Sequence, residues 1–118
     1  MRLSKLLTIP SNTRKENERE KMRIEKLSDC SIRFFEEEKQ VGHATFRHER
    51  EGVAFVEYFN VYDMDRGVRE NALKELESYV AREISGVTAL RVCCCESECD
   101  FWENGGYKKV GRFYEKRI

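Results

Sequence analysis

Several features that mark specialised protein classes are missing from this sequence of 118 residues. Pro10 is the only proline, and no apolar run reaches the roughly 20 residues that a membrane-spanning helix needs. The apolar residues near the start are too few for a secretory signal, and Pro10 interrupts them. Their absence predicts a cytoplasmic protein that does not enter a membrane.

No charge of one sign dominates the chain. Its 22 basic and 22 acidic residues are interleaved rather than collected in blocks. General nucleic-acid binding takes its affinity from a basic face, so this balance argues against that function. Hydrophobic residues make up 40% of the sequence, which is sufficient for the core of one domain of this length.

The cysteines lack the Cys-x-x-Cys spacing of a metal site or a redox motif. There are five, four of them at positions 93–99, and an odd number fits reduced thiols better than a disulfide framework. Cys93–Cys95 lie on a predicted strand, where neighbouring side chains point to opposite faces and cannot all bind one metal. No metal site is predicted. A redox role or an acyl-cysteine at Cys95 or Cys99 stays open, although small core and rim residues are the favoured interpretation.

The first 21 residues differ from the rest of the chain. Residues 12–21 are almost all polar or charged and have no apolar periodicity. They predict an N-terminal extension, residues 1–21, that is either a polar helix capped by Ser11 or disordered. Apolar patterning begins at Met22, so residues 22–118 are predicted to form a single domain.

Short apolar segments separated by polar turns predict an antiparallel meander. The last of them, residues 53–62, is almost continuously apolar, which predicts a central strand buried on both faces. The strands are expected at residues 23–27, 32–36, 41–47 and 52–62, with turns at 37–40 and 48–51.

A helical pattern follows the meander. Apolar residues recur at helical spacing from Val68 to Ile84, and Gly86 is expected to cap this helix. A strand, a helix and a strand in this order predict one parallel crossover in an otherwise antiparallel sheet, an α+β fold. The remaining elements are expected to be a strand at 88–95, a short helix at 97–104 and a last strand at 107–113.

The beginning of the long helix resembles a motif of the GNAT superfamily of N-acetyltransferases. Arg66 takes the first position of the family pattern Arg/Gln-x-x-Gly-x-Gly/Ala, whereas Arg69 and Asn71 stand where glycines are expected. The resemblance implies a GNAT-like fold in which this turn holds the pyrophosphate of acetyl-CoA. The cofactor-binding residues that it implies are Asn60, Val61, Tyr62, Arg66, Gly67, Val68, Arg69, Glu70, Asn71, Ala72 and Trp102.

A second segment is similar to the GNAT pattern Asn-x-x-Ala-x-x-Phe/Leu-Tyr-x-x-x-Gly-Phe. Phe101, Gly106 and Tyr107 fit it, but Trp102 takes the place of the tyrosine and Cys95 that of the asparagine. In the family that tyrosine commonly protonates the departing CoA thiolate, which an indole N–H cannot do near neutral pH. Tyr107 is the predicted catalytic acid, with Tyr62 or a water as the alternative.

Glu57 is the one carboxylate in the apolar segment 53–62. In a buried strand desolvation would raise its pKa, and the resemblance implies a general base on this strand that commonly acts through a water. Backbone N–H groups of residues 60–62 would then stabilise the oxyanion. The alternative is that Glu57 lies at the mouth of the cleft in contact with solvent.

These residues together favour a shortened GNAT-like N-acetyltransferase that transfers acetyl from acetyl-CoA to an amine by direct attack. Only residues 28–31 separate the first two predicted strands, so the two helices of a full-length family member are absent and the acceptor side is open. That suits a bulky acceptor such as a protein, or a homodimer. Two alternatives remain: a catalytically silent GNAT-like module that binds acyl-CoA or a protein partner, and an unrelated α+β domain.

Overall fold

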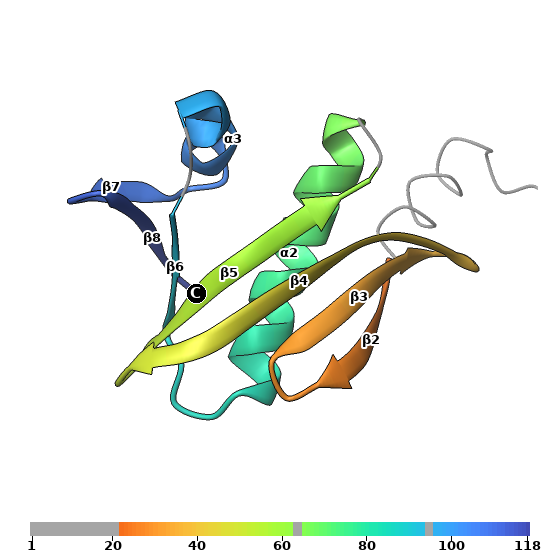
Figure 1. Cartoon of the computed structure of the whole chain (residues 1–118), viewed down its shortest axis with the longest axis horizontal. Coiled ribbons are helices and arrows are strands. Elements are labelled where there is room, and N and C mark those ends of the chain that lie inside the picture. The colour runs from red at the N-terminus through yellow and green to blue at the C-terminus, as the bar shows by residue number, and fades with distance from the viewer. Residues whose placement is uncertain (1–21, 63–64, 94–95) are drawn as a thin grey trace, which may run out of the picture.

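A seven-stranded sheet with helices on one face makes up the described part of the chain (Figure 1). The computed structural model describes residues 22–62, 65–93 and 96–118, so the predicted extension 1–21 and the predicted role of Cys95 fall outside it. The strands lie in the order β2-β3-β4-β5-β6-β8-β7. Their bounds are β2 Arg23–Ser28, β3 Ser31–Glu36, β4 Lys39–Arg50, β5 Val53–Val61, β6 Ala89–Val92, β7 Lys108–Val110 and β8 Phe113–Arg117.

The predicted meander is confirmed, because β2, β3, β4 and β5 pair as successive antiparallel neighbours. Its turns are shorter than predicted: residues 37–38 and 51–52 make them, and β4 is accordingly longer. Both turns contain a positive φ, 56° at Glu37 and 81° at Gly52. The last residues of β4 are polar and carry no apolar alternation, so their sequence does not distinguish a strand from a turn.

The predicted parallel crossover is also confirmed. Helix α2 (Arg66–Glu83) connects β5 to β6, and these two strands pair in parallel from Val53↔Ala89 to Val56↔Val92. The helix buries its apolar stripe against the sheet, and each large side chain buried in this way contributes about 1.5–3 kcal/mol. The buried helix residues are Val68, Ala72, Leu73, Leu76, Tyr79 and Val80.

The predicted cap of α2 at Gly86 is wrong. The helix ends at Glu83, and Ile84 is the capping residue, whose backbone N–H donates to the carbonyl of Val80 at 3.1 Å. Gly86 has a φ of 85° and lies in the turn that leads to β6. The glycine therefore shapes the loop after the helix. It does not end the helix.

The predicted last strand, residues 107–113, is wrong as well. Gly111, with a φ of 64°, and Arg112 form a turn that divides the segment into β7 and β8. Strand β8 pairs antiparallel with β6 on one side and with β7 on the other. The short helix is confirmed: a 3₁₀ turn η1 (Glu96–Glu98) leads into α3 (Cys99–Asn104), and Gly105 caps α3.

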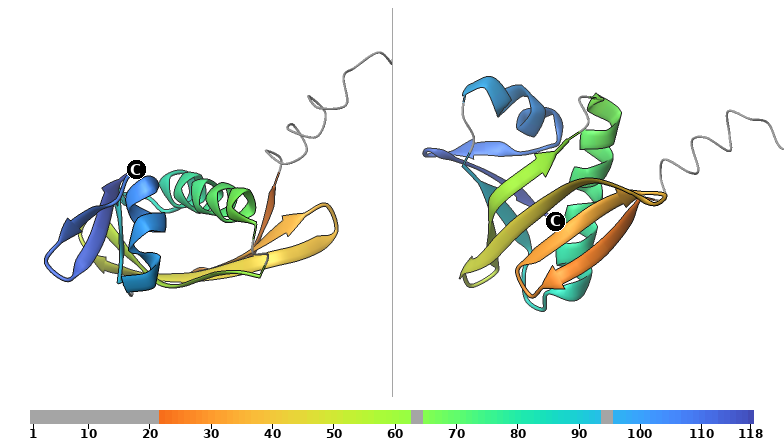
Figure 2. Two further views of the ribbon diagram at one scale, coloured as in Figure 1. Left: turned by 90° about the horizontal axis from the view of Figure 1, so that it is seen from above. Right: turned by 45° about the vertical axis from the view of Figure 1, so that its right-hand side comes forward.

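One face of the sheet carries the helices and the core, as the left view of Figure 2 shows. Ile32, Phe34, Phe46, Leu76 and Leu90 are almost completely buried between the sheet and α2. No described helix covers the opposite face, which we call the open face. Within the described residues, no helix combines the length and the apolar character that crossing a membrane requires.

Candidate functional site

A cavity opens where β5 and β6 part. Strand β6 ends at Val92, opposite Val56, whereas β5 continues to Val61. Past this point β5 has no parallel neighbour, and the cavity, which we call the cleft, has a volume of about 150 Å³. Its lining consists of Val56, Glu57, Tyr58, Phe59, Val92, Cys93, Glu98 and Trp102.

A β-bulge places Glu57 at the edge of the cleft. The register of β5 against β4 passes from Val56↔Phe46 to Tyr58↔Thr45, which leaves Glu57 as the extra residue. The predicted burial of this strand on both faces is therefore wrong at Glu57 and Tyr58, which are both exposed. The bulge shifts the regular alternation by one residue and directs two consecutive side chains toward solvent.

Glu57 is solvated and paired. Its side chain is 42% exposed and accepts a hydrogen bond from Nη1 of Arg47 at 2.8 Å. The guanidinium of Arg47 also lies 4.9 Å from the ring centroid of Phe55. The second interpretation of Glu57, a carboxylate at the cleft mouth, matches this position, and Arg47 holds the side chain in place.

The backbone donors near the cleft differ in part from those predicted. The N–H of Tyr62 donates to the carbonyl of Val41 at 2.8 Å, so it belongs to the ladder with β4. Because N–H directions alternate along a strand, Asn60 also faces β4, whereas Phe59 and Val61 face the edge beyond the end of β6. The backbone N–H of Val61 is thus free of the ladder with β4, as predicted. The backbone N–H of Phe59 is a further donor on this edge that the sequence did not indicate.

Trp102 forms the far wall of the cleft from α3. It is 5% exposed and packs against three aromatic rings, with centroid distances of 5.6 Å to Phe59, 5.3 Å to Phe101 and 5.1 Å to Tyr107. The indole brings a large apolar surface to the cleft. The tyrosine hydroxyl of the family pattern is missing at this position, as predicted.

Tyr107 lies outside the cleft lining. Its hydroxyl donates to Oε2 of Glu77 on α2 at 2.9 Å, and Nζ of Lys116 donates to Oε1 of the same carboxylate at 3.1 Å. Burial and the neighbouring Glu77 carboxylate raise the pKa of Tyr107 well above its ordinary value. The geometry gives this tyrosine a role in joining α2 to the C-terminal strands, and the prediction of a catalytic acid at Tyr107 finds no support.

An aromatic rim lies on the open face beside the cleft, formed by His43, Tyr58 and Tyr62. Tyr58 and Tyr62 are 49% and 50% exposed, and the rings of His43 and Tyr58 are 5.0 Å apart. The hydroxyl of Tyr62 is 2.8 Å from Nδ1 of His43 and accepts from Gln40 Nε2 at 3.0 Å. Exposed aromatic faces attract ammonium groups, so this rim suits a cationic ligand group. Sequence reasoning missed His43 and Tyr58 here.

The start of α2 is capped by its own chain. Oδ1 of Asp65 accepts from the N–H of Gly67 at 2.7 Å, and its carbonyl accepts from Val68 and Arg69 at 3.2 and 3.3 Å. Arg66 is paired with Glu70 at 3.2 Å. Three N–H groups that the motif assigns to a phosphate are therefore already used. Aspartate is a preferred residue at the start of a helix, so the residue type at position 65 is the sequence signal for this cap.

Arg69 connects the helix start to the cleft. Its Nη2 donates to Oε1 of Glu98 at 2.7 Å, and its guanidinium lies 4.1 Å from the ring centroid of Phe101. Glu98 itself lines the cleft. Nothing in the local sequence pointed to Glu98, because its partner lies on another element. Of the other predicted residues, Val68 and Ala72 are buried in the core, so only their backbone can meet a ligand, and Asn71 is half-buried.

The described cysteines and histidines do not gather. Within residues 22–62, 65–93 and 96–118, no group of three His, Cys, Asp or Glu side chains could hold a metal ion. Cys93 is exposed and lines the cleft, and Cys99 is half-buried on α3.

Comparison with known proteins identifies the fold. No protein-family model matches the sequence, and no curated protein matches it. Solved structures do match. N-acetylglutamate synthase from Neisseria gonorrhoeae, complexed with coenzyme A and L-arginine, is 13% identical with a TM-score of 0.63 over 75% of this chain. An acetyltransferase from Thermus thermophilus is 17% identical with a TM-score of 0.59 over 78% of this chain. The chain has the GNAT fold.

The GNAT structures that match are larger than this chain. It spans 24% of the gonococcal synthase and 67% of the Thermus acetyltransferase. The Bacillus subtilis N-acetyltransferase YlbP, in complex with coenzyme A, is 11% identical with a TM-score of 0.58, over 75% of this chain and 68% of its own. At these identities the likeness establishes the GNAT fold and leaves the activity to be argued from the residues of this chain.

Within the GNAT fold of this chain, the predicted site residues fall into three groups. The cleft brings Glu57 and Trp102 together, and Val61 lies on β5 beyond the residues that line it. Arg69 joins the helix start to this group through Glu98. Tyr107 and Tyr62 lie apart from the cleft lining, the first against α2 and the second on the open face.

Proposed function

We propose that this protein is an N-acetyltransferase that transfers acetyl from acetyl-CoA to an amine. The observation that carries the proposal is the cleft at the end of β6, which has a carboxylate at its mouth and the edge of β5 along one wall. Two of the matching structures contain coenzyme A, which supports this cofactor. Acetyl-CoA, when bound, supplies an acyl group attached to a good thiolate leaving group.

The acceptor is proposed to approach from the open face. Its ammonium group would meet the exposed ring of Tyr58 and the carboxylate of Glu57, which accepts a proton from it, directly or through one water. The free amine then forms the N–C bond to the carbonyl carbon as the C–S bond breaks. The outward N–H groups of Phe59 and Val61 would stabilise the carbonyl oxygen. Tyr58 is a cleft-lining tyrosine and becomes the proposed proton donor to the thiolate. The nitrogen releases its second proton to solvent as the amide forms, and a proton from solvent restores the tyrosine.

The fit of the cofactor's phosphates is incomplete at the helix start. The macrodipole, Arg66 and Arg69 favour an anion there, but Asp65, Glu70 and Glu98 already pair with these groups. A pyrophosphate would have to replace at least Asp65 on the backbone and Glu98 on Arg69. Within the second candidate function, a catalytically silent GNAT-like module that binds acyl-CoA or a protein partner, this pairing favours the form that binds a protein partner.

Calorimetric titration with acetyl-CoA, followed by turnover on poly-L-lysine as probe acceptor, tests the proposal. Glu57→Gln should lower turnover by about 100-fold, the lower range for loss of a general base, with unchanged cofactor affinity. Glu51→Gln, an exposed glutamate in the turn before β5, is the matched control and should change neither quantity. If the wild-type protein bound acetyl-CoA without turnover, the catalytically silent module would be the supported function. If the protein did not bind acetyl-CoA, both the acetyltransferase and the acyl-CoA-binding module would be excluded.

A further inference from the structure

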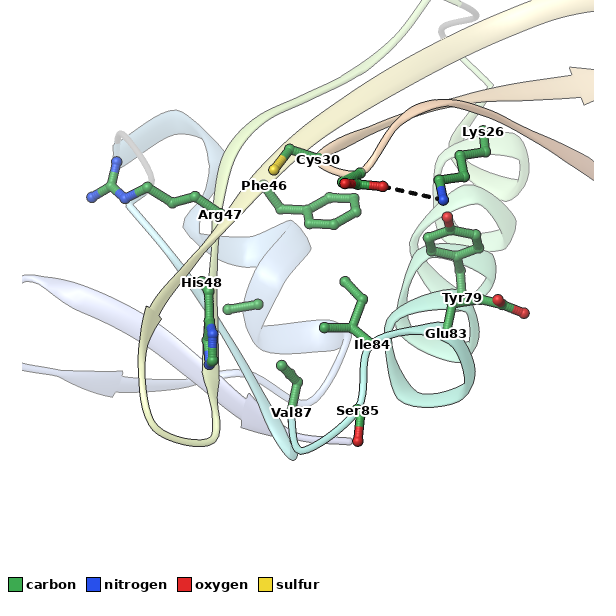
Figure 3. A pocket seen from close by; sticks show the side chains of 12 residues that line it. Lys26, Cys30, Phe46, Arg47, His48, Tyr79, Glu83, Ile84, Ser85 and Val87 are labelled. Atoms are coloured by element: carbon green, nitrogen blue, oxygen red, sulfur yellow. Dashed lines mark ion pairs between the residues drawn. The ribbon is translucent and has the colours of Figure 1, made fainter.

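A second and larger cavity lies at the other end of α2. Its volume is about 290 Å³, and it is bordered by β4, the beginning of β5, the C-terminal end of the helix and the β2–β3 turn (Figure 3). We call it the basal cavity. It shares no lining residue with the cleft. Its lining consists of Lys26, Asp29, Cys30, Phe46, Arg47, His48, Ala54, Tyr79, Glu83, Ile84, Ser85 and Val87.

The inner wall of the basal cavity is apolar and partly aromatic. The rings of Phe46 and Tyr79 are in contact, with centroids 6.3 Å apart and planes tilted by 59°, and both residues are buried, as is Val87. Figure 3 shows the side chains of Ile84 and Val87 directed toward the ring of Phe46. A wall of this kind favours the apolar body of a small ligand, because pockets for such ligands are mostly apolar with a few polar groups at fixed places.

The charged groups of the lining are unequally available to a ligand. Arg47 and Glu83 are directed away from the cavity in Figure 3, and each has a partner elsewhere, Glu57 for the arginine and Arg82 for the glutamate. Lys26 remains at the rim, where its Nζ is 3.3 Å from Oδ1 of Asp29. Both members of this pair are strongly exposed, at 58% and 94%, and such pairs are weak. A ligand carboxylate can therefore replace Asp29 as the partner of Lys26.

We propose that the basal cavity binds a small monocarboxylate with an aromatic or branched apolar body. The carboxylate pairs with Lys26, and the body packs against the wall formed by Phe46, Tyr79 and Val87. The volume corresponds to about ten water molecules at about 30 Å³ each, so a ligand of about ten non-hydrogen atoms fills it. The proposal uses no residue of the cleft and does not depend on the acetyltransferase function.

Phenylacetate has the required size and charge, and phenylacetamide is its uncharged isostere. Titration of the ¹⁵N-labelled full chain should show saturable shifts at the amides of Ala54 and Val87, with a Kd of about millimolar order for so small a ligand. The amides of Val61 and Val92 beside the cleft should not move. Phenylacetamide should bind about tenfold more weakly, because it lacks the charge-assisted hydrogen bond to Lys26.

A matched pair of lysine variants tests the recognition of the carboxylate. Lys26→Gln should weaken phenylacetate about tenfold and leave phenylacetamide unchanged, since only the ion pair is removed. Lys39→Gln alters an exposed lysine at the beginning of β4, away from the cavity, and should change neither ligand. Both positions are exposed, so both variants are expected to fold.

Cys30 provides an independent readout, because it is an exposed thiol in the cavity lining. Phenylacetate should slow its alkylation, measured on the tryptic peptide of residues 27–33. The other four cysteines fall on the peptide of residues 92–108 and should react at an unchanged rate.

Equal binding of phenylacetate and phenylacetamide would overturn the assignment to carboxylates, as would an unchanged Lys26→Gln variant. If saturating phenylacetate neither shifted the amides of Ala54 and Val87 nor slowed the alkylation of Cys30, the site itself would be overturned.

Discussion

Oδ1 of Asp65 lies 2.7 Å from the backbone nitrogen of Gly67 and accepts its hydrogen bond. That N–H group is among those that the sequence motif assigns to the pyrophosphate of acetyl-CoA. The chain therefore places a carboxylate of its own where a ligand anion would bind. Capping stabilises the helix by about 1 kcal/mol, and the same contact opposes the proposed cofactor. The strength of that opposition can be measured.

Replacing Asp65 with asparagine should raise the affinity for coenzyme A by about three- to tenfold. Asparagine caps a helix as well as aspartate does, so the free energy of unfolding should change by less than about 0.5 kcal/mol. Only the negative charge near the phosphates is removed. The affinity for coenzyme A is measured by calorimetric titration of Asp65→Asn and of the control Glu51→Gln, each at low and at high salt. An unchanged affinity would show that no phosphate binds at the helix start.

Trp102→Tyr should restore a hydroxyl to the wall of the cleft. If protonation of the thiolate limits turnover, transfer from acetyl-CoA should rise by about tenfold, a modest part of what a general acid contributes. Trp102→Phe introduces a similar loss of volume without the hydroxyl and serves as the control. Steady-state turnover of the three proteins is compared after thermal unfolding has shown that all of them are folded. Equal rates for the two variants would mean that the leaving group takes its proton from elsewhere.

Gly42→Ala should destabilise the fold by about 1–3 kcal/mol. A Cβ at this position would lie 2.4 Å from the carbonyl oxygen of Asn60 and 3.0 Å from Cα of Val61, both backbone atoms that cannot move aside alone. The matched control is Gly105→Ala, whose nearest neighbour would be the flexible tip of Leu73 at 3.1 Å. Urea unfolding gives the comparison. Similar midpoints for the two variants would contradict the close contact of β4 with β5.

Stability should fall as the pH rises above about 10, and Tyr107 should account for part of the loss. Burial and Glu77 raise its pKa in the folded state above the unfolded value of about 10. The stabilisation that comes from this raised pKa is therefore fully present below pH 10. It is lost as the pH rises further, at up to about 1.4 kcal/mol per pH unit. Tyr107→Phe should show a smaller alkaline loss, whereas Tyr58→Phe, at an exposed position, should behave as the wild type. The free energy of unfolding of the three proteins is measured by urea unfolding at several pH values.

The part of the fold that follows from local patterns was predictable. The apolar stripe from Val68 to Val80 identified α2, and the short polar turns identified the meander. Strand β8 was not found, because the pattern that supports it is not local. Its Glu115 pairs with Arg91 on β6 at 2.7 Å, and its Tyr114 is buried only because α3 lies beside it, where Glu103 accepts its hydroxyl at 2.9 Å. In the sequence these residues form a charged tail after one glycine.

The site was predicted at the level of elements and missed at the level of side chains. Glu57 and Trp102 do meet in one cleft, because the order of strands and helices determines which chain ends come together. The solvation of Glu57 depends on a bulge, and a bulge adds one residue to a strand without changing its composition. The partners of Arg69 and Asp65 likewise depend on which carboxylate comes nearest after folding. Residue types alone do not specify that choice.

The position of β6 has a consequence for the order in which the molecule assembles. Strands β2 to β5 pair with their neighbours in sequence, so this half of the sheet can form through local contacts. Strand β6 pairs on one side with β5, from which a whole helix separates it, and on the other with β8 near the C-terminus. Contacts between such distant segments form slowly, because long loops must close first. We therefore expect the boundary between β5 and β6, where the cleft lies, to be among the last parts of the sheet to form.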